Sequence, residues 1–222
     1  MTLLLGLDVG TTSIKAVVYE RDGTAVGAAA VPTPTHFPHP GRAYFRPDEI
    51  WDSVVRVIRG AVAECRDASR IASVAVAAFG EAGLMVDAAG EPTTDIIAWF
   101  DTRTQPQAAW LDEQIGKDEL FARSGISLQP IFSLCKILWH REHEPEAWRQ
   151  SSRWLMAADF IAFRLCGVQA TDLSLASRTL MLDLAAKSWD PRTLADAELD
   201  ASIVAPLVPG GTPLGPVTAT AS

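Results

Sequence analysis

Residues 6–23 read GLDVGTTSIKAVVYERDG and contain the turn that decides the fold. The apolar run at residues 3–7, just before this turn, predicts a strand buried on both faces, because a short continuous apolar run is typical of a sheet interior. After the Gly-Thr-Thr segment at 10–12 the chain continues with β-branched residues at 13–19, which predict a second strand. We therefore expect Gly-Thr-Thr to join two strands.

Further elements follow in a recognisable order. Asp22 and Gly23 form a tight-turn signal ahead of a third predicted strand at 24–31. From Pro47 onward the apolar residues recur at helical spacing, with acidic residues in the first turn where the helix dipole favours them. Another apolar, β-branched run at 71–79 predicts a strand. The expected order is β-β-β-α-β, in the α/β class.

Composition limits the function classes. The chain has 222 residues, 48% of them hydrophobic and 21% charged, which is typical of a globular protein. Its formal net charge of -8 argues against a nucleic-acid partner and against an anionic membrane. Asp8 interrupts the apolar N-terminus, which lacks a basic flank, so we expect no signal or membrane span and a cytoplasmic protein. Cys65, Cys135 and Cys166 are widely spaced and odd in number, which indicates free thiols.

The Gly-Thr-Thr turn has the chemistry of an anion site. A dinucleotide-binding turn or a P-loop leads from a strand into a helix, whereas this turn is expected to lie in a hairpin. Backbone N–H groups and hydroxyls of Gly10, Thr11 and Thr12 can surround an anion there. Asp8, at the end of the preceding strand, can hold a divalent cation directly or through water. Together these groups suit a nucleotide phosphate with Mg²⁺; the alternative is a β-turn with good turn residues and no ligand.

Several segments, in order, resemble one enzyme family. Residues 5–23 resemble the phosphate-binding hairpin of the actin, heat-shock chaperone and sugar-kinase superfamily. Residues 71–104 are similar to the part of FGGY carbohydrate kinases that ends in their Trp-x-Asp-x-Arg signature, here Trp99, Asp101 and Arg103. The strings FSLCKILWHREHEPEAW, WLMAADFIAFRLCG and TDLSLASRTLMLD resemble the next three landmarks of that family. On these motifs the chain is identified as a member of the FGGY family over almost all of its length.

The resemblance implies a fold and a reaction. The implied fold is a ribonuclease-H-like, actin-type ATPase domain with a mixed five-stranded sheet and flanking helices. Residues 1–222 would form the N-terminal, sugar-binding and phosphate-hairpin lobe, without the C-terminal nucleotide lobe that carries the catalytic base. The implied reaction transfers the γ-phosphoryl group of ATP, with Mg²⁺, to a hydroxyl of a sugar, sugar acid or polyol. The implied partner is a small carbohydrate, and a homodimer of a longer form is left open.

The resemblance also assigns roles in the hairpin. Asp8 would act in catalysis by orienting Mg²⁺ or its waters. Gly10, Thr11 and Thr12 would bind the phosphates of ATP. Lys15 stands where family members often carry a basic residue near these phosphates; the alternative is a solvated lysine on a strand.

Sugar contacts are implied at two places, the turn after the strand at 71–79 and the Trp-x-Asp-x-Arg signature. In the turn they fall on Gly80, Glu81 and Ala82, with Glu81 the best candidate because a carboxylate can accept hydrogen bonds from two adjacent hydroxyls. The alternative for Glu81 is an exposed loop residue. Trp99 would offer its ring to the sugar or lie in the core. Asp101 would pair with the arginine of the signature and shape the loop.

The acceptor is not identified by these motifs. Glycerol kinases carry Gln-Arg-Glu-Thr at the turn and xylulokinases Gln-Met-His-Gly, whereas residues 80–83 are Gly-Glu-Ala-Gly. Ile131 also stands where glycerol kinases place a tyrosine that contacts the substrate. A second hypothesis is a non-catalytic sugar-binding or interaction module, since the isolated chain is expected to be inactive. A different ATPase of the superfamily is disfavoured by the signature at 99–103.

Overall fold

The structure is a computed structural model that describes residues 2–219 and 221. The chain divides into two compact units. The first unit comprises the chain up to His36 together with Phe45–Phe79. The second comprises Phe37–Tyr44 and the chain from Gly80 onward.

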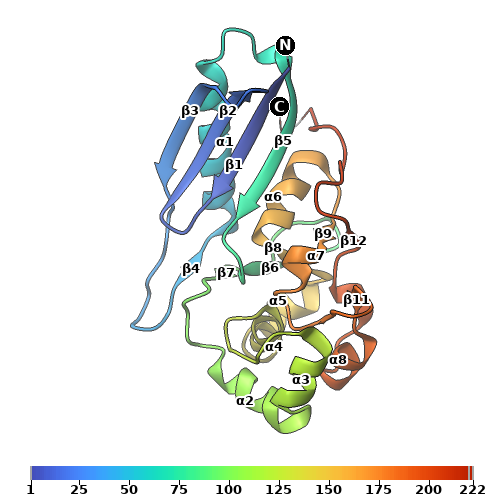
Figure 1. Cartoon of the computed structure of the whole chain (residues 1–222). Helices are drawn as coiled ribbons and strands as arrows, with labels where there is room; N and C mark the ends of the chain where they lie inside the picture. Colours follow the sequence, from blue (N-terminus) through green and yellow to red (C-terminus); the bar gives the residue numbers. More distant parts are fainter. Residues whose placement is uncertain (1, 220, 222) are drawn as a thin grey trace. The chain divides into compact units, whose positions relative to one another are not determined.

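The first unit consists of a mixed sheet and one long helix (Figure 1). Its elements are β1 (Leu3–Val9), β2 (Ser13–Glu20), β3 (Ala25–Pro32), α1 (Pro47–Ala63), η1 (Ala68–Arg70) and β5 (Ile71–Ala78), while the short β4 (Tyr44–Phe45) lies at the boundary of the unit. This order confirms the predicted β-β-β-α-β sequence of elements.

The sheet has the strand order β3-β2-β1-β5. Strand β1 pairs antiparallel with β2 and parallel with β5, and β2 pairs antiparallel with β3. The predicted mixed sheet is therefore confirmed, but the predicted number of five strands is wrong, because within the described residues four strands form this sheet. The short strands of the second unit pair in separate two-stranded ladders instead.

Strand β1 is buried on one face only, which corrects the prediction of burial on both. Its side chains alternate, with Leu3 and Leu5 buried while Leu4 is 41% exposed and Asp8 is exposed. Successive side chains of a strand point to opposite faces, so one helix layer covers only every second residue. A run of apolar residues cannot by itself reveal this alternation.

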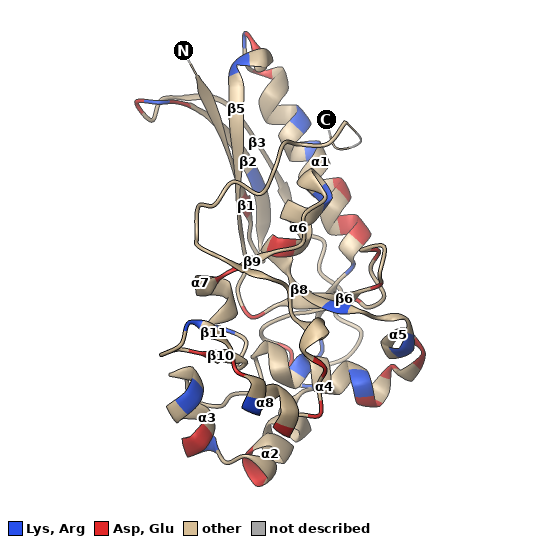
Figure 2. Ribbon diagram, turned by 90° about the vertical axis from the view of Figure 1, so that its right-hand side faces the viewer, with Lys and Arg blue, Asp and Glu red and all other residues tan. Residues whose placement is uncertain are grey.

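Helix α1 packs closely against β2 and β3. Pro47 stands in its first turn, where the missing N–H costs nothing, and Ile50 and Val54 are fully buried on its inner face. A Cβ added to Gly27 of β3 would clash with the carbonyl oxygen of Ala61. The backbone of α1 therefore packs directly against the backbone of β3 at this point, with no side chain between them. Charged residues recur along α1, whereas the strands carry few of them (Figure 2), and Asp48, Asp52, Arg56 and Arg59 of the helix are exposed.

The second unit is mainly helical, with short two-stranded ladders. Its elements are β6 (Gly83–Val86), β7 (Ile96–Ile97), α2 (Gln105–Gln114), α3 (Lys117–Ser124), α4 (Ser133–His143), α5 (Pro145–Gln150), β8 (Arg153–Met156), α6 (Ala157–Cys166), β9 (Thr171–Asp172), α7 (Leu173–Ala176), β10 (Leu182–Asp183), β11 (Ser188–Trp189), α8 (Pro191–Asp196), η2 (Ala201–Ile203) and β12 (Leu207–Val208). Strand β6 pairs antiparallel with β8, with Gly83 opposite Met156.

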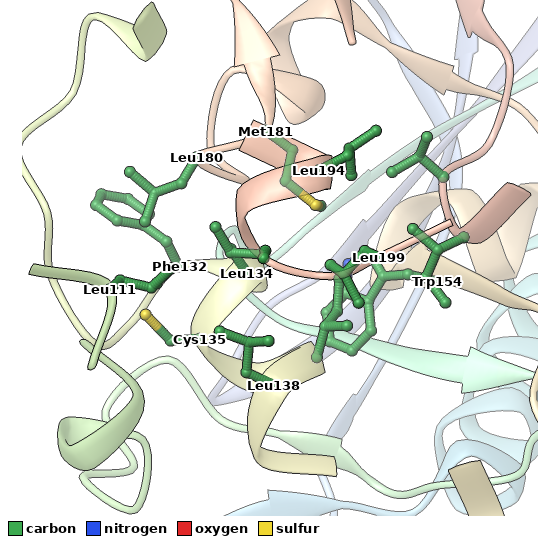
Figure 3. Packing of buried hydrophobic residues seen from close by; sticks show 14 of the residues in the cluster. Leu111, Phe132, Leu134, Cys135, Leu138, Trp154, Leu180, Met181, Leu194 and Leu199 are labelled. Carbon is green, nitrogen blue, oxygen red and sulfur yellow. The ribbon is translucent and has the colours of Figure 1, made fainter. Parts of the chain in front are cut away.

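The core of the second unit is built around α4. Figure 3 shows Leu134, Cys135 and Leu138 of this helix beside side chains from more distant segments, including Leu180 and Leu194. Every residue of α4 from the first to the eighth is buried, which makes it a helix without a solvent face in this stretch. A helix of this kind places any charge it carries in the core.

Cys65, Cys135 and Cys166 are free thiols, as predicted; Cys135 is buried and the other two are partly buried. Among the described residues no helix combines the length and the apolar character needed to cross a membrane.

Gly27→Ala should destabilise the first unit, because the added methyl group must push α1 away from β3. We expect a loss of about 1–3 kcal/mol in the free energy of unfolding, measured by urea denaturation. Gly210→Ala is the matched control, since a Cβ there meets nothing within 4 Å. Equal stability of the two variants would contradict the close packing of α1 on β3.

Candidate functional site

The hairpin in the first unit places Asp8 and Lys15 opposite each other. Asp8 lies in β1 one residue before its end, and the β1–β2 register pairs it with Lys15. Residues directly opposite in an antiparallel pair project from the same face. Both side chains are exposed, so a carboxylate and an ammonium group stand together on the open face of the sheet.

The turn between them is held by its own backbone and by one threonine. The backbone N–H of Gly10 donates to the carbonyl oxygen of Ser13 at 3.0 Å. Thr33, which follows β3, donates through Oγ1 to the carbonyl oxygen of Gly10 at 2.6 Å, and its N–H donates to the carbonyl oxygen of Thr12 at 3.1 Å. The predicted turn between two strands is confirmed, and it is anchored from a third strand segment.

The hairpin carries side chains that could bind a cation and side chains that could bind an anion. Thr12 is exposed and Thr11 is partly buried, next to the exposed Asp8 and Lys15. Within the described residues no group of three or more His, Cys, Asp or Glu side chains could hold a metal ion. A cation at Asp8 would thus complete its shell with water and ligand oxygens, which is the usual manner of Mg²⁺ in phosphate sites.

The predicted sugar-contacting turn opens the second unit. Gly80 is partly buried, and a Cβ added there would meet nothing within 4 Å. Ala82 is fully buried, and its carbonyl oxygen accepts a hydrogen bond of 3.0 Å from the N–H of Ala157. Glu81 lies between them, with 18% of its side chain exposed and a φ of 54°. Ala82 thus anchors the turn, and Glu81 is the residue that presents a functional group.

Two cations reach Glu81 from distant parts of the chain. Lys136 of α4 donates from Nζ to the main-chain carbonyl oxygen of Glu81 and, at 3.1 Å, to that of Ile97. Arg178, just after α7, donates from Nε to Oε1 of Glu81 at 2.5 Å. The guanidinium carbon of Arg178 lies 5.1 Å from the centre of the Phe132 ring.

Lys136 is an ionisable group in the core. Its side chain is fully buried, and burial lowers its pKa to about 7, although the nearby carboxylates of Asp101 and Glu81 act in the opposite direction. A fully buried lysine is uncommon without hydrogen-bond partners, and the carbonyl oxygens of Glu81 and Ile97 are those partners here.

The Trp-x-Asp-x-Arg signature forms a closed loop around Asp101. Asp101 is 2% exposed and accepts hydrogen bonds from the N–H of Ala43 at 2.6 Å, from the N–H of Arg103 at 2.8 Å and from the Arg103 guanidinium at 2.8 and 2.9 Å. Burial alone would raise the pKa of Asp101, but these donors outweigh it and lower the pKa. The expected pairing of Asp101 with Arg103 is confirmed. Asp101 is thereby occupied in shaping the loop.

The aromatic residues of the loop are exposed. Trp99 is 45% exposed, so the alternative of a core role for it is wrong. Its ring meets Phe100 edge-on at 5.4 Å, and Phe100 stacks on Phe37 at 6.3 Å. Phe37 and Phe100 line a hollow of about 350 Å³ formed with residues 38–43. The loop therefore presents apolar ring surface on the second unit.

Sequence reasoning missed Lys136 and Arg178. Both lie inside strings that resemble the family, but no role was predicted for either. One signal was available for Lys136: its charge is flanked on both sides by apolar residues, Leu134 and Cys135 before it and Ile137 and Leu138 after it. Arg178 carries no comparable signal, because its partner Glu81 lies 97 residues away in the sequence.

The chain is similar to known carbohydrate kinases in sequence and in fold. A glycerol kinase from Alkalilimnicola ehrlichii is 35% identical over 217 residues, which cover 94% of this chain and 44% of that protein. A gluconokinase from Bacillus subtilis is 27% identical over 206 residues, 93% of this chain and 40% of that protein. The crystal structure of a xylulose kinase from Rhodospirillum rubrum superposes with a TM-score of 0.92 at 28% identity, covering 99% of this chain and 45% of that one.

The fold is thus that of the sugar kinases, an α/β fold with a mixed sheet. The sequence profile of the N-terminal domain of the FGGY family of carbohydrate kinases matches residues 3–222. The chain belongs to this family, as the motifs indicated. It spans less than half the length of the relatives named above.

Asp101→Asn should destabilise the second unit at neutral pH by about 1–3 kcal/mol, because the charged partner of Arg103 is lost in a buried site. The pKa of Asp101 is lowered in the folded state, so its stabilising effect is present above the ordinary value of 3.8 and is lost as the pH falls through the folded pKa. Urea unfolding at pH 7 and at acidic pH measures this.

The control for this substitution is Asp52→Asn, which changes an exposed aspartate of α1 in the same way. A constant difference between Asp101→Asn and the unmodified protein across the acidic range would contradict the role assigned to the charge of Asp101.

Proposed function

We propose that this chain is the N-terminal lobe of an ATP-dependent kinase that phosphorylates a hydroxyl group of a sugar, sugar acid or polyol. The observation that carries the proposal is the exposed hairpin, in which Asp8 and Lys15 flank the Gly-Thr-Thr turn. Membership of the FGGY family supports the same reaction class.

The hairpin suits the phosphate end of the reaction. Phosphoryl transfer depends mainly on positioning and on neutralising the phosphoryl oxygens. The N–H of Gly10 is already bonded to Ser13 within the turn, so the hydroxyls of Thr11 and Thr12 and the ammonium group of Lys15 are the proposed donors for phosphate oxygens. Asp8 would hold Mg²⁺ or its waters, and the ion would offset the charge of the phosphates.

The second unit suits the acceptor. Glu81 has a carboxylate oxygen that can accept hydrogen bonds from hydroxyl groups, and Trp99 has an exposed ring that can pack on the C–H face of a sugar. Gly80 leaves open space beside Glu81. The named relatives phosphorylate, by their names, glycerol, gluconate and xylulose, so the proposed acceptor is a small polyhydroxylated compound.

The proposed kinase needs more than this lobe. The relatives are more than twice as long as their matched parts, and the resemblance places the catalytic base and the adenosine site in their second lobe. Residues 1–222 would then supply the phosphate hairpin and the sugar contacts. We propose a cytoplasmic location, where ATP is available.

Asp8→Asn should reduce kcat by about 10²- to 10³-fold, because the variant loses the charge that orients Mg²⁺ beside the phosphates. The assay is ATP-dependent formation of a phosphorylated product from glycerol, D-gluconate and D-xylulose, using the longest protein that the native gene encodes. Sugar affinity should stay within about twofold, since the two units hold separate ligand groups. An unchanged kcat would remove Asp8 from the reaction.

Glu81→Gln should weaken carbohydrate binding by about tenfold, because an amide oxygen is a poorer acceptor than a carboxylate oxygen. Calorimetric titration with the carbohydrate that gives the highest turnover measures the dissociation constant. Glu113→Gln, an exposed residue of α2, is the matched control. If Glu81→Gln and the control bind equally well, Glu81 is an ordinary loop residue.

A further inference from the structure

Glu81 has an unusual backbone conformation. Its φ of 54° lies in the left-handed region, which glycine occupies easily and which is unfavourable for a residue with a Cβ atom. The neighbouring Gly80 and Gly83 show no such φ. Such a residue persists only where its surroundings hold it, and residues of this kind cluster at ligand-binding turns.

The main chain of Glu81 is held from the core. Lys136 is fully buried and donates to the carbonyl oxygen of Glu81 and to that of Ile97. Ile97 lies two residues before Trp99, where the signature loop begins. One ammonium group therefore connects the turn that carries Glu81 with the base of the loop that carries Trp99. Both segments are the proposed contacts of the acceptor.

The side chain of Glu81 is held from another direction. Arg178 engages Oε1 at 2.5 Å, and its guanidinium group packs over the ring of Phe132. Arg178 is 42% exposed at its side chain, so the pair lies at the edge of the protein core. With Oε1 fixed by a planar guanidinium group, Oε2 has a defined direction and remains available to a ligand hydroxyl.

We propose that Lys136 and Arg178 are positioning residues that hold Glu81, by its main chain and by its carboxylate, in the orientation that recognises the acceptor hydroxyls. This inference rests on the proposed function, because it assumes that Glu81 contacts the carbohydrate. Neither cation needs to touch the substrate. They hold the turn at 80–83 in one conformation before the carbohydrate binds. No conformational entropy is then lost in ordering this turn on binding, and the affinity for the carbohydrate is higher.

The first measurement follows the turn itself and needs no carbohydrate. Lys136→Met removes the donor to the two carbonyl oxygens, and Arg178→Gln removes the ionic partner of Glu81. Amide hydrogen exchange of residues 80–83 should become about tenfold faster in each variant. Lys117→Met and Arg149→Gln, which change exposed side chains of α3 and α5, should leave that exchange unchanged. Unchanged exchange in both Lys136→Met and Arg178→Gln would overturn the proposal.

The second measurement follows binding of the same carbohydrates, glycerol, D-gluconate and D-xylulose. Lys136→Met and Arg178→Gln should each raise the dissociation constant by about tenfold, and Arg178→Lys should recover part of the loss. In a Glu81→Gln background, Arg178→Gln should add less than about twofold, because Arg178 acts through the carboxylate that is already absent. A full additional loss in that background would overturn the positioning role of Arg178.

The two measurements separate the inference from the proposed function. If the unmodified protein binds none of the three carbohydrates, the proposed function fails for these acceptors. Amide hydrogen exchange at residues 80–83 still decides whether Lys136 and Arg178 hold the turn. If Lys136→Met does not fold, Arg178→Gln decides, since 42% of the Arg178 side chain is exposed. Faster exchange with unchanged carbohydrate affinity would contradict the inference.

Discussion

The first unit depends on the hydrogen bonding of β1 to two neighbours of opposite direction. Antiparallel pairing with β2 produces the tight turn at 10–12, and parallel pairing with β5 brings the chain back after α1. A parallel neighbour requires a crossover, which α1 supplies by packing on β2 and β3 at the close approach of Gly27. The position of Asp8 at the end of β1 follows from this pairing.

The second unit depends on buried charges that are satisfied by specific partners. Asp101 is balanced by Arg103 and by the N–H of Ala43, and Lys136 by the carbonyl oxygens of Glu81 and Ile97. Burying an unpaired charge would cost several kcal/mol, so these contacts strongly restrict the paths of the loops that carry them. The unit thus uses polar contacts to shape loops and apolar contacts around α4 to fill its core.

The turn at 80–83 combines a residue held by specific contacts with neighbours that are open. Lys136 of α4 and Arg178, just after α7, contact Glu81, whereas Gly80 borders open space and Trp99 is 45% exposed. A change at those positions alters the shape offered to a ligand without removing a buried contact. The fold is shared with a xylulose kinase from Rhodospirillum rubrum that is 28% identical to this chain.

The sequence by itself determined the order of elements in the first unit, the hairpin turn and the family, because turn residues, strand patterns and motifs are local in the chain. It also predicted the Asp101–Arg103 pair, which the structure confirms, and it offered Glu81 as a candidate contact of the acceptor; both lie within short motifs. Only the tertiary structure decided that β1 has an open face, that Trp99 is exposed and that Lys136 and Arg178 meet at Glu81. These features arise from contacts between residues far apart in sequence, and the packing of distant segments is not encoded in any local pattern.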